Sequence, residues 1–393
     1  MTLGFYYHIT AVSLNGNVYL PSYLGLFVDS IAVRVKHLVL FLHEATDSEV
    51  ESCNYALQSD NISWVNLGKK KPAWHRALFG KSLLKKIETD VLHCDAMLVR
   101  APTPLSAAFF YVFRDKTPIV YMLVGDYVAG VPHLKLPFLR KWAIYAMAVY
   151  LDRSLKRAAR FCCILSNSNE VLEKLKPFTK ASHYIRTTTL SEKDFFERSD
   201  TCLSALYHVL YTGRFDFAKG LKELLEACAS LIIKGVPIRL HLAGWEDTPG
   251  KPVVSWLEQR ANALGIAQHV VNHGKKAHGE ALNALYRSAD IFVMPSYQEG
   301  FPRSIWEAMA NGVPVIATAV GSIPHNLCDG KEALLIPPKQ AGAIADKMEL
   351  LIRDAALRKK LIANGLSTAR EVTLESQSKI LIDIIDSYLS SHH

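Results

Sequence analysis

The sequence predicts an α/β protein made of two Rossmann-like domains that face one another across a cleft. Three observations predict this fold class. The chain has 393 residues, of which 50% are hydrophobic and 21% charged, a globular composition long enough for two cores. Short apolar runs of strand type alternate with amphipathic segments of helix type, as in a doubly wound parallel sheet. A polar interval at residues 187–202 interrupts this alternation, which then starts again.

The N-terminal half contains strand-like runs that are apolar enough to be buried on both faces of a sheet. They cover residues 3–9, 37–43, 95–101, 118–126 and 160–167. Amphipathic segments separate these runs, among them 22–36 and 138–157, and predict covering helices. We therefore expect residues 1–190 to form the first domain.

The C-terminal half repeats the pattern. Strands are expected at 206–213, 238–244, 269–274, 290–296, 313–318 and 332–338, and helices at 219–235, 253–264, 279–289 and 302–311. Residues 340–392 have helical patterns without strands. We expect a second domain over 204–370, and a C-terminal helix over 371–393 that crosses back to the N-terminal domain.

The composition narrows the class of partner. A net charge of +8 indicates an anionic partner, which can be nucleic acid, anionic lipid or a phosphorylated substrate. The chain has no zinc spacing, arginine-rich tail or aromatic-basic RNA signature, so nucleic acid is not expected. Seven cysteines without a CxxC pair indicate reduced thiols and a cytoplasmic protein. We expect no signal peptide and no membrane-spanning segment.

Two glutamates, Glu299 and Glu307, follow the strand-like run 291–294 with seven residues between them. Glu299 lies in the turn before the expected helix and Glu307 on the flank of that helix. A rise of about 1.5 Å per residue allows a separation on the order of 10 Å, roughly the length of a sugar nucleotide from ribose to hexose. Each carboxylate can accept two hydroxyl donors. The amides of Gly300 and Phe301 open the helix and suit a phosphate.

Two cations, Arg214 and Lys219, bracket a turn that also follows a strand and opens a helix. They can neutralise a diphosphate without a metal ion, and Gly213 permits close backbone approach. Alternatively, they are surface cations beside a loop. No Asp-x-Asp pair occurs in the sequence, so we expect no metal site.

Residues 205–338 resemble the donor-binding domain of retaining glycosyltransferases of the GT-B fold, family four, the group 1 type. The resemblance rests on the stretches GRFDFAKG, HLAGW, LYRSADIFVMPSYQEGFPRSIWEAMANGVPVIAT and GSIPHNLCDGKEALLIPP. The N-terminal resemblance is looser. There, HITAVSLNGNVYLPSYLG stands where the family has its first glycine-containing loop.

The resemblance implies that Arg214 and Lys219 bind the donor diphosphate, Glu307 the ribose and Glu299 the transferring sugar. The implied donor site consists of Gly16, Gly213, Arg214, Lys219, Glu299, Gly300, Phe301 and Glu307. In it, Gly16 would border the diphosphate from the opposite domain.

One departure from the family concerns catalysis. Many members have a histidine near the anomeric carbon, whereas this chain reads YMLVGDY, so Asp126 is the candidate there. Asp126 can orient a sugar hydroxyl, accept the acceptor's proton or simply cap the following turn. With Glu299, Arg214 and Lys219 it completes the expected catalytic set. His8 is a weaker candidate for the acceptor side and is expected to be a core histidine with satisfied hydrogen bonds.

The implied function is retaining transfer of a hexosyl unit from a nucleoside-diphosphate sugar to a saccharide, by front-face attack and without cofactor or metal. Two alternatives stay open. One is a GT-B-like sugar-nucleotide epimerase or phosphorylase, and the other is a sugar-nucleotide-binding protein without catalysis.

The segment 68–86 has seven Lys or Arg residues and no acid, with apolar residues at nearly helical spacing. It predicts a basic amphipathic helix on an anionic membrane surface. The basic segment 135–160 is instead expected to bury its apolar stripe in the domain core. A lipid-linked saccharide is then the expected acceptor, in polysaccharide or lipopolysaccharide synthesis by a cytoplasmic, peripheral enzyme.

Overall fold

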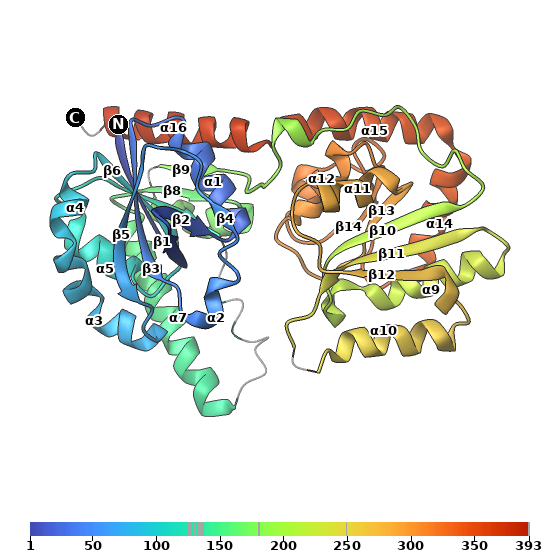
Figure 1. The fold of residues 1–393 in the computed structure, drawn as a ribbon, viewed down its shortest axis with the longest axis horizontal. Helices are drawn as coiled ribbons and strands as arrows, with labels where there is room; N and C mark the ends of the chain where they lie inside the picture. The colour runs from blue at the N-terminus through green and yellow to red at the C-terminus, as the bar shows by residue number, and fades with distance from the viewer. Residues whose placement is uncertain (125–127, 129–130, 132–136, 180, 249, 392–393) are drawn as a thin grey trace. The chain divides into compact units, whose positions relative to one another are not determined.

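The computed structural model describes residues 1–124, 128, 131, 137–179, 181–248 and 250–391. The chain forms two compact α/β units (Figure 1). The first comprises Met1–Thr187 and Leu374–His393, and the second Thr188–Thr373.

The described part of the first unit contains a nine-stranded sheet. Its strands are β1 (Thr2–Leu14), β2 (Asn17–Leu20), β3 (His37–Glu44), β4 (Tyr55–Ala56), β5 (Ile62–Lys69), β6 (Ala96–Ala101), β7 (Ile119–Leu123), β8 (Cys163–Ser166) and β9 (Ser182–Tyr184). The parallel part runs β5-β3-β1-β6-β7-β8-β9, and the end of β1 turns back into antiparallel β2, which pairs with β4. The predicted parallel sheet is therefore confirmed.

Strand β5 was not among the predicted strands. It pairs only with β3, at the edge of the sheet, and most of its residues are half-exposed. An edge strand that is not buried on both faces lacks the continuous apolar run that identifies a central parallel strand.

The helices of the first unit include α1 (Ser22–Ala32), α2 (Asp47–Val50), α3 (Ala73–Lys86), α4 (Glu88–Leu92), α5 (Ser106–Phe113), α7 (Phe138–Ala158), α8 (Asn169–Leu175) and α16 (Leu374–Ser390). Figure 1 shows α16 running along the first unit beside α1. Arg34 fixes it there, donating from Nε to Ser378 Oγ at 2.8 Å and from Nη2 to Glu375 O at 2.7 Å. The C-terminal helix thus returns to the N-terminal domain, as predicted.

Two expectations about basic segments were wrong. Residues 68 and 69 end strand β5, so the helix begins only at Ala73. Within it, Arg76 is buried beneath the helix instead of lying on a polar face. On α7, Phe138 and Trp142 are exposed, so its apolar stripe is not simply part of the core.

The second unit has a six-stranded, fully parallel sheet in the order β12-β11-β10-β13-β14-β15. Its strands are β10 (Tyr207–Arg214), β11 (Ile238–Trp245), β12 (Val270–Gly274), β13 (Ile291–Met294), β14 (Val315–Thr318) and β15 (Leu334–Ile336). Its longer helices are α9 (Leu221–Ile233), α10 (Pro252–Ala263), α11 (Glu280–Ser288), α12 (Arg303–Ala310), α14 (Ala341–Arg353) and α15 (Ala355–Arg370). Numbered from β10, this order is 3-2-1-4-5-6, the order of a dinucleotide-binding sheet.

Residues 188–203, which have the polar composition of a linker, pack on the second unit. Leu190 belongs to its hydrophobic core. The guanidinium of Arg198 donates hydrogen bonds to the carbonyl oxygens of Gly312, Arg287 and Ala289 at 2.8–3.0 Å. These bonds satisfy carbonyl groups near the ends of α11 and α12.

Candidate functional site

The strand order of the second sheet places two chemically important loops side by side. Strands β10 and β13 are neighbours. After β10 the chain continues to β11 toward one edge of the sheet, and after β13 it continues to β14 toward the other edge. Such a switch point opens a crevice at the carboxyl ends of the strands, where ligands of doubly wound sheets bind. The loop after β10 contains Lys219, and the loop after β13 contains Glu299.

Two glycines allow neighbouring turns to close on the loop after β13. A Cβ atom on Gly220, whose φ is 65°, would lie 2.0 Å from the carbonyl oxygen of Pro295. A Cβ atom on Gly321, whose φ is 56°, would lie 1.7 Å from the carbonyl oxygen of Glu299. Both the backbone conformation and the close approach therefore require glycine at these positions.

Hydrogen bonds from the neighbouring turns fix the same loop. Tyr297 N donates to the carbonyl oxygen of Ala218 at 2.8 Å, and Ser322 N donates to that of Gly300 at 2.9 Å. Thr318 Oγ1, at the end of β14, donates to the carbonyl oxygen of Ser296 at 2.6 Å. The backbone that presents Glu299 is thus tied to the turns on both sides of it.

Lys219 and Glu299 meet in this crevice. Lys219 Nζ lies 2.6 Å from Glu299 Oε1, which also accepts a hydrogen bond from Ser296 Oγ at 2.7 Å. Both side chains are mostly buried, with 19% and 11% of their surface exposed. An ammonium group has three N–H donors, so Lys219 can hold Glu299 and still donate to an anionic ligand.

Arg214 lies at the carboxyl end of β10 and is half-exposed. Its Nη2 is 3.7 Å from Asp216 Oδ2, too long for a strong hydrogen bond. The preceding residue, Gly213, has φ 149° and lies opposite Gly244 of β11, where a Cβ would come within 1.9 Å of the Gly213 carbonyl oxygen. This strand end therefore allows close approach to the backbone beside an available guanidinium.

Glu307 is buried, whereas the sequence placed it on the flank of α12. Its Oε2 accepts a hydrogen bond from Tyr286 OH at 2.9 Å, and its Oε1 accepts one from Thr189 Oγ1 at 3.3 Å. His278 Nε2 lies 3.5 Å from Oε1. Burial alone would raise the pKa of Glu307, but the hydrogen bond from His278 and neighbouring positive charges lower it below its usual value. The group is therefore a carboxylate at neutral pH.

The three partners of Glu307 were not predicted from the sequence. Tyr286 was visible only as an apolar position of a predicted helix, and its hydroxyl also lies 2.5 Å from Thr212 Oγ1 on β10. Thr189 falls in the polar interval 187–202, for which no helix or strand was predicted. No spacing in the chain connects either residue, or His278, with Glu307.

Helix α12 begins at Arg303, one residue later than predicted, with Pro302 as its N-cap. Within the described residues, the amides of Gly300 and Phe301 donate to no other backbone group. The Phe301 ring stacks on Trp306 with centroids 4.2 Å apart, which fixes the start of the helix. These amides are available to an anion at the N-terminus of α12.

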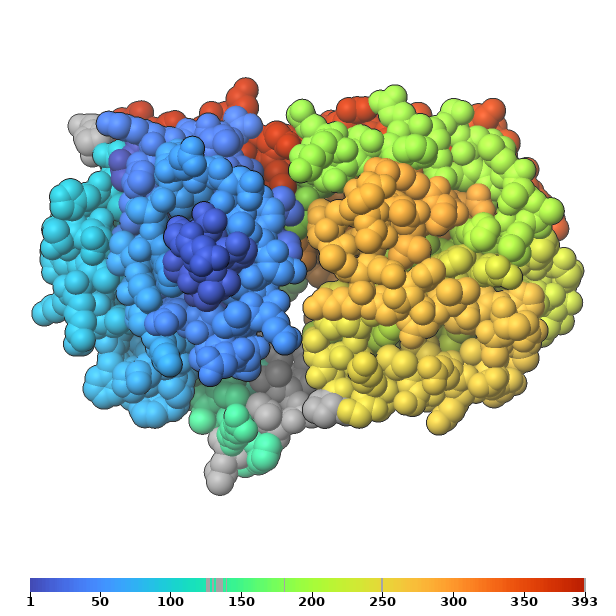
Figure 2. Space-filling view, viewed as in Figure 1, coloured from blue at the N-terminus to red at the C-terminus, as the bar shows by residue number. Residues whose placement is uncertain are grey.

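The other predicted site residues belong to the first unit. Gly16, with φ 81°, occupies the exposed turn between β1 and β2. Figure 2 shows N-terminal segments, in the darkest blue, at the surface of the first unit. Asp126 lies outside the described residues. His8 lies in β1 and is partly buried. Desolvation, together with the charges of Lys70, Arg76 and Arg100, lowers its pKa to about 4. Its Nδ1 has no hydrogen-bond partner among the described residues, so the expectation of a satisfied histidine was wrong.

No three His, Cys, Asp or Glu side chains in the described ranges are grouped so that they could hold a metal ion. None of the helices that can be described is both long and apolar enough to span a bilayer.

Comparisons with known proteins identify the family of the chain. Residues 204–368 match the family model of glycosyl transferases group 1. An uncharacterized glycosyltransferase of Methanocaldococcus jannaschii is 30% identical over 362 residues, which cover 86% of this chain and 89% of that protein. The chain belongs to the group 1 glycosyl transferases. The predicted family is thus confirmed.

Solved structures extend the similarity of this glycosyltransferase to both units. HepE of Anabaena, in complex with UDP, has a TM-score of 0.71 at 19% identity, covering 98% of this chain and all of HepE. Sucrose-phosphate synthase of Thermosynechococcus elongatus has a TM-score of 0.73 at 19% identity and covers 99% of both chains. At this identity the similarity establishes the fold, and it confirms the predicted GT-B fold.

Other curated relatives match only part of the chain. The D-inositol 3-phosphate glycosyltransferase of an Arthrobacter strain is 34% identical over 200 residues, which are 47% of this chain and 45% of that protein. The Corynebacterium urealyticum enzyme of the same name is 32% identical over 44% of this chain and 41% of its own length. The chain therefore matches less than half the length of these relatives.

Proposed function

We propose that this glycosyltransferase transfers a hexosyl unit from a nucleoside-diphosphate sugar to a saccharide acceptor with retention of configuration. The observation that carries the proposal is the switch point of the second sheet. There Lys219 and Glu299 are in contact, and Arg214 lies at the end of the adjacent strand. Two cations and one carboxylate that can accept hydroxyl groups, gathered at this strand edge, suit a ligand that joins a diphosphate to a sugar.

In this proposal Arg214 and Lys219 bind the diphosphate and stabilise the negative charge that grows on it as the sugar departs. They take the place of a metal ion, which is consistent with the lack of an Asp-x-Asp pair in the sequence. As the bond between the sugar and the diphosphate breaks, the anomeric carbon becomes strongly cationic. The acceptor hydroxyl attacks this carbon on the same face from which the diphosphate leaves. The departing phosphate oxygen takes the acceptor's proton.

Two carboxylates orient the donor in this proposal. Glu299 accepts hydroxyl groups of the transferring sugar, while the amides of Gly300 and Phe301 donate to its phosphate end. Glu307 accepts the ribose hydroxyls. Its contacts to Thr189 and His278, at 3.3 and 3.5 Å, are longer than the one to Tyr286 and are the ones that a ribose would replace.

The direct test is turnover of a panel of nucleotide sugars by the wild-type chain and by the double variant Arg214→Ala/Lys219→Ala. We expect turnover with at least one donor and its near loss in the double variant. Lys222→Ala is the matched control, because Lys222 is an exposed cation on α9 three residues beyond Lys219. Equal activity of all three proteins would contradict the diphosphate assignment. Interconversion of the sugar without transfer would indicate an epimerase, and binding without turnover a non-catalytic protein.

We also propose that α3 docks on an anionic membrane surface and that the acceptor is lipid-linked, which places synthesis of a polysaccharide or lipopolysaccharide at the cytoplasmic face. Trp74, Leu78 and Phe79 support this, since 57%, 71% and 54% of their surfaces are exposed. Lysines 81 and 85, on the same helix, are exposed beside them. An exposed apolar stripe with neighbouring lysines suits the boundary between head groups and acyl chains.

Sedimentation with vesicles tests this docking. Leu78→Ser/Phe79→Ser should reduce binding to vesicles that contain phosphatidylglycerol. Ile233→Ser is the control, because Ile233 is an equally exposed apolar residue of the second unit. Unchanged sedimentation of the α3 variant would end the docking proposal.

A further inference from the structure

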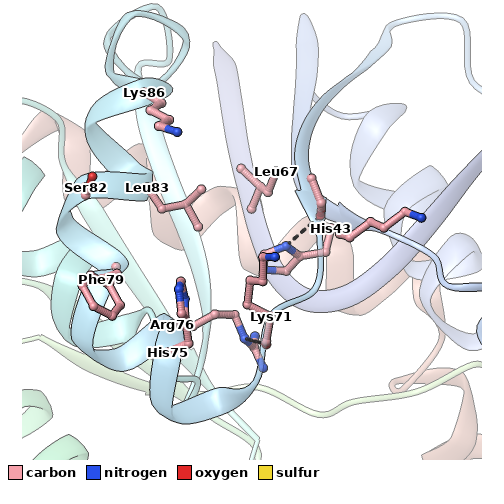
Figure 3. A pocket seen from close by; sticks show the side chains of 12 residues that line it. His43, Leu67, Lys71, His75, Arg76, Phe79, Ser82, Leu83 and Lys86 are labelled. Carbon is pink, nitrogen blue, oxygen red and sulfur yellow. Dashed lines mark hydrogen bonds between the residues drawn. The ribbon is translucent and has the colours of Figure 1, made fainter.

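The first unit contains a pocket of about 270 Å³ between the carboxyl ends of β3 and β5 and the helix α3. This size is at the lower end of the range of ligand pockets, roughly 300–1,000 Å³, and suits one small molecule. Figure 3 shows His43 on the strand side of the pocket and Arg76 on the helix side. Its position at the carboxyl ends of parallel strands is where doubly wound sheets bind ligands.

Strand β3 is irregular where it borders this pocket, and β1 is irregular at the positions that pair with that part of β3. The pairing of β3 with β5 shifts between Leu42 and Glu44, at His43. The pairing of β1 with β3 shifts between Tyr6 and Thr10, around His8. Bulges of this kind redirect side chains and occur often beside functional sites.

Arg76 is a buried cation that has no anionic partner among the described residues. Only 7% of its surface is exposed. Its Nε donates to the carbonyl oxygen of Lys71 at 2.9 Å, but its Nη1 has no hydrogen-bond partner, and it forms no ion pair with any described residue. Guanidinium stays charged at all ordinary pH values, and buried charges are normally paired. The pocket therefore supplies a position for an anion that no described residue fills.

His43 supplies the opposite kind of group. Only 1% of it is exposed, and its Nδ1 lies 3.2 Å from the carbonyl oxygen of Gly68. Because a carbonyl oxygen can only accept, the proton of the neutral ring belongs on Nδ1. Nε2 then has a free lone pair, and it too has no partner among the described residues. This atom requires a hydrogen-bond donor such as a hydroxyl group.

The other lining residues extend the positive charge. Lys69, Lys71 and Lys86 border the pocket, and none of the twelve described lining residues is acidic. Within the described part of the chain these three lysines form no ion pairs. Leu67 and Leu83 supply apolar walls.

We propose that this pocket binds a phosphorylated sugar or polyol, with its phosphate against Arg76 and the lysines and one of its hydroxyls donating to His43 Nε2. The inference rests on the proposed function, because it assigns the pocket to a phosphate-bearing part of the acceptor. A phosphate matches several cations better than a single carboxylate does, since it carries up to two charges and presents several acceptor oxygens. The same chemistry can come from a soluble sugar phosphate or from a phospholipid head group.

The test follows the ring of His43 by NMR in the full chain with labelled histidine. Inorganic phosphate and glucose 1-phosphate are titrated separately, and His43→Asn identifies the signal. We expect both ligands to shift the His43 signal, and glucose 1-phosphate to bind more tightly because it also carries hydroxyls. No shift with either ligand up to tens of millimolar would overturn the proposal.

Variants test the charge assignment. Arg76→Gln should weaken glucose 1-phosphate binding about 10- to 100-fold, the loss expected for a charged hydrogen bond. Lys86→Gln should weaken it less, and Arg76→Lys should restore part of the affinity if Arg76→Gln proves unstable. Lys379→Gln, an exposed cation on α16, is the control for charge alone. Equal affinity of Arg76→Gln, Lys86→Gln and the control would refute the assignment.

Two further arms separate the possible sources and the two proposals. Vesicles containing phosphatidylinositol, compared with phosphatidylcholine alone, show whether a head group competes with glucose 1-phosphate for the pocket. Binding of UDP-glucose and of the other nucleotide sugars of the panel is measured on the same samples. If UDP-glucose binds but the His43 signal does not respond to phosphate, this inference fails and the donor site stands. If phosphate shifts His43 but no nucleotide sugar binds, the donor proposal fails instead.

Discussion

Gly321→Ala should disable the candidate donor site although it replaces no residue that is proposed to contact the donor. The new Cβ would lie 1.7 Å from the carbonyl oxygen of Glu299, and ordinary contact begins near 3.4 Å. The loop would therefore have to move by about 1.7 Å. Displacements of about 1 Å can cost roughly 100-fold in rate, so we expect turnover of a nucleotide sugar to fall by about that factor.

The backbone contributes a separate effect on stability. Gly321 has φ 56°, and alanine in this left-handed region costs about 1–2 kcal/mol. Gly265 separates the two effects, because it has φ 70° but nothing lies within 4 Å of the position that a Cβ atom would take there. Gly265→Ala should therefore lose a similar amount of unfolding free energy, about 1–2 kcal/mol, but keep its activity.

The assays are steady-state turnover with saturating and limiting donor, and urea unfolding of both variants. Loss of turnover in Gly321→Ala alone, with a rise in the donor KM, supports the role of the clamped loop. If both variants retain equal turnover, the loop after β13 does not need its fixed position. Glu299 would then not depend on preorganisation by this loop.

Three further outcomes are expected. Tyr286→Phe removes a buried hydrogen bond to Glu307 and should lower the unfolding free energy by about 1–3 kcal/mol in urea titrations, while an unchanged midpoint would contradict the contact. Turnover should persist after treatment with a chelator, and activity restored only by added divalent ions would show that the cations do not suffice. Burial lowers the pKa of His43 to about 4, so the unfolded chain takes up a proton first as pH falls below about 6.5. The contribution of neutral His43 to the unfolding free energy is present above pH 6.5, and about 3 kcal/mol of it is lost toward pH 4. Urea titrations at pH 7 and pH 4.5 measure this loss as the difference in unfolding free energy between the wild type and His43→Asn.

The central strands could be predicted from the sequence because burial on both faces requires continuous apolar runs. The strands of the second sheet followed from the same rule, and the crevice followed from the alternation of strands and helices. The edge strand β5 escaped prediction because one-sided burial leaves polar residues such as Asn66 in the run.

The candidate site was predictable only in part. Lys219 and Glu299 could be paired because each follows a strand, and adjacent parallel strands end at the same edge. The burial of Glu307 could not be predicted, because its partner Thr189 is 118 positions away in the chain. Arg76 was counted with the surface lysines, since a run of cations does not reveal which of them the fold turns inward.

The return of α16 to the first unit affects how that unit folds during synthesis on the ribosome. Leu381 and Ile385 cover the same apolar cluster as Leu24 and Val28 of α1. The ribosome must synthesise all of Thr188–Thr373 before these residues exist. At about 5–20 residues per second this leaves one apolar face of the nascent first unit uncovered for roughly 10–40 s. During that interval the emerging chain is a natural client for chaperones.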